Sequence, residues 1–388
     1  MNIIKFALRE YFLPVLIIIT LLSGCAAQPT LAELREGVAA RAQGDIEIGL
    51  AWPLTSNDGG LSQGVDLAVS EINAGGGING RHLRILAKDD EGSVTQGEAV
   101  AQEFVQNKNI VAVIGDRNSF VSLPAAAIYN EAGVVMLTPG STDPELTQKG
   151  YQFVFRGIPS DAAIARRLAD YAKQQGYRRM AIYYSDDAYG RGLANAFEDS
   201  ADQVGLTIVD RISYYDNIKQ LALKWQALDC DGVLVADSLP DGGRFMLAAR
   251  QAGIKVPFLG GNALDSPDLI KIAGQAAEDA VVGSFFNPQD SRPEVRKFEQ
   301  AFRVKYGSEP SQWAAAGYDA VNLLAEAIAK AKSAEPARIA AQLHALRDWP
   351  GVLGLHSFDQ TGEEQGRLVV LKQVQNGKFV YLDGVRQK

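Results

Sequence analysis

The pattern of apolar and polar residues predicts strands and helices in regular alternation from residue 46 onward. Apolar residues at helical spacing, as in 61–72, separate short apolar runs that are typical of buried strands. Those runs lie at 46–53, 83–88, 110–114, 134–137, 180–184, 206–210, 232–236, 256–259 and 280–286. Strands that alternate with helices in this way favour right-handed βαβ units. We therefore predict an α/β fold with two doubly wound parallel sheets.

The C-terminal part follows another pattern. Three stretches with helical spacing, 294–306, 315–332 and 337–346, follow one another without a strong strand signal between them. They carry too little strand material for a third domain. We expect them to pack on one of the two sheets.

The first residues resemble an export signal. Lys5 and Arg9 precede an apolar run, residues 12–22, that is too short to cross a membrane as a helix. The run ends in Leu22-Ser23-Gly24-Cys25, which resembles the lipobox of bacterial lipoproteins. The resemblance implies a lipoprotein signal peptide over 1–24, a lipid on Cys25 and a tether over 25–45. The alternative is a plain signal peptide with a chance cysteine.

The composition of the chain excludes some classes of function. The chain has 388 residues, a net charge of −8 and 47% hydrophobic residues, as expected for a globular protein of about two domains. The acidic balance disfavours nucleic acid as a partner. Three histidines and two cysteines leave little material for a metal site. If Cys25 carries a lipid, Cys230 has no partner for a disulfide, and we expect it to be a buried structural cysteine.

The sequence lacks the common enzyme motifs. It has neither a P-loop nor a Gly-x-Ser-x-Gly elbow. Glycines 75–77 follow a helix and precede a strand, whereas a dinucleotide fingerprint needs the opposite order. His82, His344 and His356 are too scattered for a zinc motif. We therefore expect no enzyme activity and no cofactor.

Several segments resemble, in the same order along the chain, those of the leucine/isoleucine/valine-binding protein family. The family comprises type I periplasmic solute-binding proteins of ABC importers. The resemblance runs from about residue 46 to 362 and rests on these segments: Val69-Ser-Glu-Ile-Asn-Ala-Gly-Gly-Gly-Ile-Asn-Gly-Arg81, Leu137-Thr-Pro-Gly-Ser-Thr-Asp-Pro-Glu-Leu146, Tyr151-Gln-Phe-Val-Phe-Arg156, Asp187-Ala-Tyr-Gly-Arg-Gly192, Ala249-Arg-Gln-Ala-Gly253 and Gly317-Tyr-Asp-Ala320.

The resemblance implies a two-lobed periplasmic-binding fold with a three-strand hinge. The chain would cross between the lobes near 156–159, 284–288 and 354–359. The first lobe would hold 46–157 and 285–355, and the second would hold 158–284 and 356–388. A ligand would lie between the lobes, at the carboxyl ends of the strands.

Ser119 and Thr142 match the family positions that hold the ligand carboxylate. Each follows a predicted strand, where a hydroxyl group and free backbone N–H groups suit an anion. Gly140 would permit close approach of the backbone, and Ser141 belongs to the same loop. The alternative for the two hydroxyl groups is a helix-capping or turn role.

Aromatic residues are the next candidates. Tyr189 matches a tyrosine that the family places in the second lobe, and it would combine an apolar ring with a hydrogen-bonding tip. Trp313 falls where the family has an aromatic wall, and Trp52 follows the first strand. Either tryptophan could instead belong to the core.

The sequence also departs from the family. Asn262 stands where amino-acid binders usually place a glutamate for the ligand's ammonium group, and Ser238 and Asn57 stand in place of tyrosines. A buried ammonium group needs an anion. Asp237 or Asp187 could supply it. The ligand is then a carboxylate whose amine is recognised differently or is missing.

The resulting hypothesis is a lipid-anchored receptor of the bacterial cell envelope. It would capture a small amino-acid-like ligand and deliver it to an ABC permease. The alternative is a regulatory or sensor lipoprotein on the same fold, for example an activator of cell-wall synthesis. Ala26 would permit an outer-membrane destination, which favours the alternative, whereas Ser119, Gly140, Thr142 and Tyr189 favour the receptor.

Overall fold

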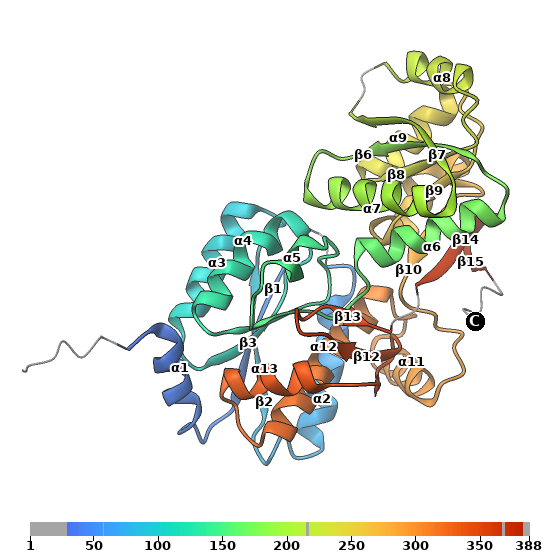
Figure 1. Ribbon diagram of the computed structural model, residues 1–388. Coiled ribbons are helices and arrows are strands. Elements are labelled where there is room, and N and C mark those ends of the chain that lie inside the picture. Colours follow the sequence, from blue (N-terminus) through green and yellow to red (C-terminus); the bar gives the residue numbers. More distant parts are fainter. Residues whose placement is uncertain (1–28, 57, 215–216, 367–368, 383–388) are drawn as a thin grey trace, which may run out of the picture.

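The computed structural model describes residues 29–56, 58–214, 217–366 and 369–382. The chain forms two lobes, one above the other in Figure 1, each built on its own β-sheet. The first lobe lies at the lower left of the view and the second at the upper right. The predicted two-lobed α/β architecture is therefore confirmed.

The sheet of the first lobe is fully parallel. Its order is β2-β1-β3-β4-β5. Successive residues of each strand point to opposite faces, so Leu137 packs in the cluster with α2 and α12 while Met136 packs in the cluster with α3 and α4. The strands are β1 (Ile46–Trp52), β2 (Leu83–Asp89), β3 (Ile110–Ile114), β4 (Val135–Thr138) and β5 (Val154–Arg156).

Helices cover both faces of this sheet. One face carries α2, α12 and the neighbouring helices of the C-terminal part, and the other carries α3 and α4. The C-terminal helices thus pack on the first sheet, as expected. The helices of this lobe are α2 (Leu61–Ala74), α3 (Val94–Gln106), α4 (Ser119–Glu131), α5 (Glu145–Gln148), α11 (Pro293–Tyr306), α12 (Gln312–Ala331) and α13 (Pro336–Ala345).

The sheet of the second lobe is mixed. Five strands run parallel in the order β10-β9-β8-β6-β7, and β14 and β15 extend it antiparallel beyond β10. We predicted a purely parallel sheet, and this antiparallel edge is a difference. The strands are β6 (Arg179–Tyr184), β7 (Thr207–Ser213), β8 (Gly232–Ala236), β9 (Phe258–Gly260), β10 (Val281–Ser284), β14 (Val370–Gln375) and β15 (Lys378–Tyr381).

Alternation along the strands also divides the second core. Ile182 packs with α6 and α7, while Tyr183 packs with α8, α9 and α10. The helices of this lobe are α6 (Asp161–Gln174), α7 (Ala188–Val204), α8 (Ile218–Ala227), α9 (Asp241–Gln251), α10 (Pro267–Ala273) and the 3-10 turns η1 (Asn262–Leu264) and η2 (Gly274–Ala277). Cys230 is half-buried in this lobe, and its thiol donates to Gly232 O at 3.0 Å.

The third crossing between the lobes lies later than expected. A small antiparallel sheet of β11 (Trp349–Pro350), β12 (Leu355–Phe358) and β13 (Glu364–Gln365) belongs to the first lobe, because Phe358 joins that lobe's core. Val369 joins the core of the second lobe. The segment up to Gln365 therefore belongs to the first lobe and Val369 to the second, so the crossing expected near 354–359 was placed too early.

Residues 31–39 differ from the expected tether, because they form the helix α1 (Leu31–Ala39) docked on the first lobe. The Thr30 hydroxyl accepts from Glu33 N, and the Glu33 carboxylate accepts from Thr30 N in return. Arg35 is fully buried and donates to Ile110 O at 2.9 Å and to Val105 O at 2.7 Å. Burial lowers the pKa of Arg35 to about 10.

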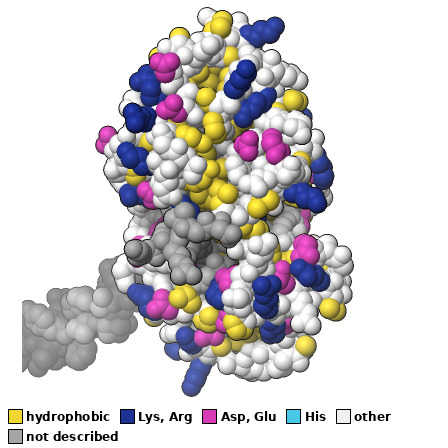
Figure 2. Space-filling model, turned by 90° about the vertical axis from the view of Figure 1, so that its right-hand side faces the viewer, with side chains coloured by type: hydrophobic (Ala, Val, Ile, Leu, Met, Phe, Trp, Pro, Cys, Tyr) yellow, Lys and Arg dark blue, Asp and Glu magenta, His cyan; other side chains and the backbone are white. Residues whose placement is uncertain are grey.

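The outer surface carries charges of both signs. Lysine and arginine side chains lie among aspartate and glutamate side chains on both lobes in the face that Figure 2 shows. On this face the second lobe also bears a band of hydrophobic side chains. Within the described residues, no helix is long and apolar enough to span a membrane.

Candidate functional site

A cavity of about 70 Å³ lies between the lobes, where strands of both sheets end. In the first lobe, Ser119 begins the helix after β3 and Thr142 follows β4. In the second lobe, Tyr189 lies in the first turn of the helix after β6, and Asn262 follows β9. The lining residues of the first lobe are Arg117, Asn118, Ser119, Gly140, Thr142 and Trp313, and those of the second are Tyr189, Ser238, Leu239, Asn262 and Ala263.

Hydroxyl groups hold the loop after β4 in place. The Ser119 Oγ accepts from the backbone N–H groups of Thr142 and Asp143, each at 3.3 Å. The Thr138 Oγ1 accepts from Gly140 N at 3.1 Å and from Ser141 N at 3.0 Å. Ser119 thus stabilises the turn after β4 and does not cap its own helix, and its hydroxyl proton remains able to donate to a ligand.

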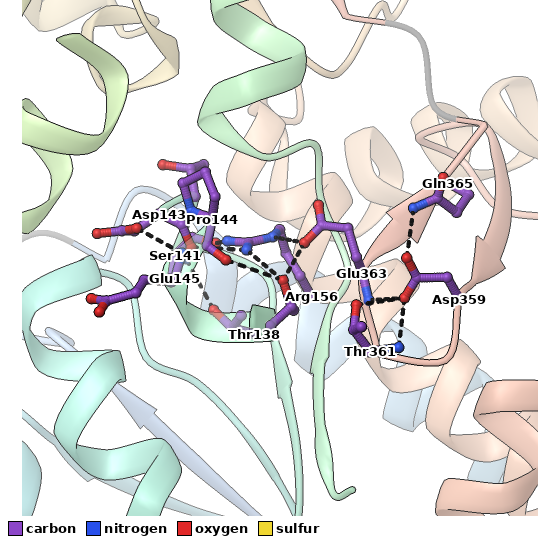
Figure 3. A network of polar contacts seen from close by, with 12 residues as sticks. Thr138, Ser141, Asp143, Pro144, Glu145, Arg156, Asp359, Thr361, Glu363 and Gln365 are labelled. Atoms are coloured by element: carbon purple, nitrogen blue, oxygen red, sulfur yellow. Dashed lines mark hydrogen bonds and ion pairs between the residues drawn. The ribbon is translucent and has the colours of Figure 1, made fainter. Parts of the chain in front are cut away.

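Arg156 also fixes this loop, and its guanidinium lies between the loop and Glu363 (Figure 3). Its guanidinium donates to Ser141 O at 2.7 Å, to Asp143 O at 2.8 Å and to the Glu363 carboxylate at 2.9 Å. Arg156 is fully buried and Glu363 is 18% exposed. The network joins β5, the loop after β4 and the segment before β13, so it sets the position of the cavity wall.

Neighbouring residues leave no room for a side chain at Gly140. A Cβ atom at this position would lie 2.6 Å from the Arg117 Cα and 2.7 Å from the Trp52 Cη2. Trp52 lies behind the cavity wall, donates from its indole N–H to Asp58 O at 3.0 Å, and packs edge-on against Trp313 at 5.9 Å. Trp52 is therefore a support of the wall and not part of the lining.

Two polar side chains of the second lobe face the cavity. The Asn262 Oδ1 is buried and makes no hydrogen bond within the described residues. The Tyr189 hydroxyl is buried as well, and the backbone N–H of Ala263 is the protein group that faces it. The backbone of Asn262 is fixed, because its carbonyl accepts from the Gln312 Nε2 of the first lobe at 2.8 Å. Buried polar groups without partners are rare in native proteins. These two atoms are suited to bind a polar ligand.

Arg117 is the charged side chain among the residues that line the cavity. Its guanidinium lies over the Trp313 ring, 4.7 Å from the ring centroid. Burial lowers the pKa of Arg117 to about 10, so it stays cationic at neutral pH. The lining thus combines one cation, several hydroxyl and amide groups and the apolar surface of Trp313 and Leu239.

The structure brings together six of the nine residues selected from the sequence. Ser141 and Asp237 are buried but do not line the cavity, and neither does Trp52. The Asp237 carboxylate accepts from Ser238 N at 2.7 Å, and burial raises its pKa to about 7. Asp187 caps α7 by accepting from Gly190 N at 2.8 Å.

Sequence reasoning did not select Arg117, Asn118, Ser238, Leu239 and Ala263. Arg117 and Asn118 lie in the same strand-to-helix turn as Ser119, which was the signal for them. Ser238 was considered only as a missing tyrosine. Leu239 and Ala263 are common apolar residues that no local pattern distinguishes from core residues.

Metal-binding side chains do not gather in the described part of the chain. No group there holds three or more histidine, cysteine, aspartate or glutamate side chains in a suitable arrangement. The lining residues have hydrogen-bonding groups and one cation, which suit an organic ligand with an anionic group.

Known proteins resemble the chain over most of its length. A family model described as periplasmic binding protein matches residues 45–378. The Leu/Ile/Val-binding protein of Escherichia coli (strain K12) is 32% identical over 314 residues, which cover 78% of this chain and 82% of that protein. The Leu/Ile/Val-binding protein homolog 1 of Brucella abortus is 28% identical and covers 89% of this chain and 93% of its own length.

Solved structures of similar proteins have the same fold as this chain. An ABC transporter substrate-binding protein from Desulfitobacterium hafniense, solved in complex with Leu, is 50% identical and superposes with a TM-score of 0.81. The match covers 87% of this chain and all of that one. A leucine-binding protein from Thermotoga maritima is 27% identical, with a TM-score of 0.81 over 87% of this chain and 98% of its own. The chain belongs to the leucine/isoleucine/valine-binding protein family, the type I periplasmic binding proteins of ABC transporters.

Proposed function

We propose that the protein captures a branched-chain amino acid such as leucine between its lobes and delivers it to an ABC importer. The family is one of solute-binding proteins and not of enzymes. The observation that carries the proposal is the cavity itself, which hydroxyl groups line from both lobes and Trp313 closes as an apolar wall. The 50% identical protein of Desulfitobacterium hafniense in complex with Leu supports this ligand class.

Each lobe would contact a different part of the ligand. Ser119 would receive the carboxylate, because its hydroxyl group is a good donor to an anion. Arg117 adds a positive charge on the same side of the cavity. Tyr189 and Asn262 would close on the ligand from the second lobe, where the Tyr189 hydroxyl would donate to it and the unpartnered Asn262 Oδ1 would accept from it.

A thermal unfolding screen with L-leucine, L-isoleucine and L-valine tests this function. A ligand at 100 times its Kd should stabilise the protein by about 2.7 kcal/mol. Tyr189→Phe should lose much of that stabilisation, whereas Tyr183→Phe should keep it, because the Tyr183 ring stacks on Phe245 at 3.6 Å, away from the cavity residues. No stabilisation of the wild-type protein by any amino acid would oppose the receptor and favour the regulatory alternative.

We also propose a lipid anchor on Cys25, which lies outside the described residues. The basis is the sequence Leu22-Ser23-Gly24-Cys25 after an apolar run. Cys25→Ser should move the protein from the membrane fraction of the producing bacterium to the soluble fraction, as measured by immunoblotting. Cys230→Ser is the matched control, because that thiol lies half-buried in the second lobe, and it should leave the protein in the membrane fraction. An unchanged distribution of Cys25→Ser would refute the anchor.

A further inference from the structure

A pair of buried aspartates lies behind the cavity wall of the first lobe. Asp90 directly follows β2, and Asp116 lies two residues after β3; these are the strands on either side of β1. Both side chains are fully buried. Asp116 directly precedes Arg117, the charged residue of the cavity lining. The pair therefore adjoins the cation that, in the proposed function, attracts the ligand's carboxylate.

The two carboxyl groups face each other and have few other partners. The Asp90 Oδ1 accepts from Gly92 N at 2.8 Å. The Asp90 Oδ2 and both carboxyl oxygens of Asp116 make no hydrogen bond of normal geometry to an N–H or O–H group of another described residue. The groups that face the Asp116 carboxyl group are the Asp90 carboxyl group and the backbone N–H of Asp116 itself. Two carboxylates in contact repel each other, and a proton between them turns the repulsion into a hydrogen bond.

The backbone of Asp116 fixes the pair against the cavity wall. The Asp116 carbonyl accepts from the Thr138 Oγ1 at 2.9 Å and from the Ser122 Oγ at 3.2 Å. The same Thr138 hydroxyl accepts from Gly140 N at 3.1 Å. Because this backbone is held by α4 and by the loop after β4, a charge on the pair acts on Arg117 through space and not by moving the wall.

Arg117 has negative charges on its protein side as well as the expected ligand carboxylate on its cavity side. The charges of Asp58 and Asp90 both act on its guanidinium group. The same side chain lines the cavity. A cation that lies between two anions attracts a ligand less strongly than a cation whose other neighbour is neutral.

We propose that Asp116 keeps a proton that it donates to Asp90, and that ionised Asp90 competes with the ligand's carboxylate for the charge of Arg117. The proposal rests on the proposed function, in which that carboxylate lies on the Arg117 side of the cavity. When Asp90 takes up a proton of its own, the competition ends and the ligand binds more tightly. Asp90 is thus a positioning residue that strengthens the capture of an anionic group in acid.

The groups around the pair set the pH range of this effect. Burial and the charge of Asp89 raise the pKa of Asp90 to about 6, against the hydrogen bonds of its carboxyl group and the charge of Arg117. Burial and the charge of Asp90 raise the pKa of Asp116 well above its usual value of about 4. Burial also raises the pKa of Tyr129 of α4, on which the charges of both aspartates act, so its hydroxyl stays neutral. Through Asp90 alone, leucine binding is therefore strongest below pH 6 and weakens as the pH rises toward 8.

Calorimetric titration with L-leucine between pH 5 and pH 8 tests the proposal by comparing the wild-type protein with Asp90→Asn. The asparagine keeps the acceptor for Gly92 N and is uncharged at every pH, so it resembles protonated Asp90. The wild-type Kd divided by the variant Kd should be near one at pH 5 and rise to roughly five at pH 8. Asp161 and Asp237, two other buried carboxyl groups with raised pKa values, are present in both proteins, so their effects cancel in this ratio.

Tyr129→Phe is the matched control, because it removes a buried hydroxyl group near the same pair that makes no hydrogen bond within the described residues. It should change the Kd by the same factor at every pH, as a purely structural change does. A ratio for Asp90→Asn that stays constant or falls as the pH rises would overturn the proposal.

Carbon-13 NMR of the aspartate carboxyl groups tests the pair in the wild-type protein, without a variant and without leucine. We expect the Asp90 carboxyl carbon to titrate near pH 6 and that of Asp116 at higher pH. Ionisation of both groups that is complete below pH 5 would overturn the proposal. A wild-type protein that binds no leucine would instead refute the proposed function, whatever the NMR titration shows.

Discussion

Replacing Arg156 with methionine should lower the free energy of unfolding by about 3–5 kcal/mol. The guanidinium is fully buried and holds the Glu363 carboxylate and the carbonyls of Ser141 and Asp143. Removing one partner of a buried ion pair leaves the others desolvated and unpaired, which is the costly case. Urea unfolding followed by circular dichroism measures the change.

Arg166→Met is the matched control for this prediction. Arg166 is a half-exposed arginine of α6 that pairs with Asp170 at 3.2 Å. A surface pair of this kind contributes only ~0–1 kcal/mol. Equal losses in the two variants, or a loss below 1 kcal/mol for Arg156→Met, would mean that the Arg156 network does not support the loop after β4.

Gly140→Ala should weaken leucine binding by about 100-fold. The new Cβ would meet the Arg117 Cα at 2.6 Å and the Trp52 Cη2 at 2.7 Å, so the loop must move away from Ser119 and the cavity. Overpacking costs ~1–3 kcal/mol, and the upper end applies because the nearest atom is backbone and cannot rotate aside. A loss of 2.7 kcal/mol corresponds to 100-fold in Kd, and calorimetric titration with L-leucine measures it.

Gly157→Ala is the control for this second prediction. It lies at the first crossing between the lobes, but a Cβ there would make ordinary contacts, the nearest at 3.4 Å from the Leu137 Cδ1. Its Kd for leucine should stay within about twofold of the wild-type value. Undiminished binding by Gly140→Ala would show that the ligand does not touch this loop.

The two-lobed fold could be predicted because buried parallel strands are short and apolar and their helices carry an apolar stripe. Neighbouring residues of one strand pack in the two different cores on either side of its sheet, as Met136 and Leu137 do in the first lobe and Ile182 and Tyr183 do in the second. The edge strands β14 and β15 carry a weaker pattern, because they mix polar and apolar residues at the sheet's border. The helix α1 was missed since its buried residues are only Ala39 and Arg35, and an arginine is usually a surface residue.

The third crossing was misplaced because the sequence does not show which core receives Phe358. That choice depends on long-range contacts, such as the packing of Phe358 against Phe155 at 5.5 Å. The candidate site was predicted best where a residue directly follows a strand, as Ser119 and Thr142 do. Arg156 and Glu363 lie 207 positions apart, so no local pattern connects them.

The sequence directed attention to Asp237 and Asp187 because they lie near the expected amine-binding positions, whereas the structure gives both of them backbone partners.

A crystal structure of the protein grown with L-leucine tests the central claim most directly. We expect leucine in the cavity between the lobes, with its carboxylate at the Ser119 hydroxyl. We also expect Tyr189 and Asn262 to contact the ligand from the second lobe. Leucine bound elsewhere, or an empty cavity at saturating leucine, would contradict the account.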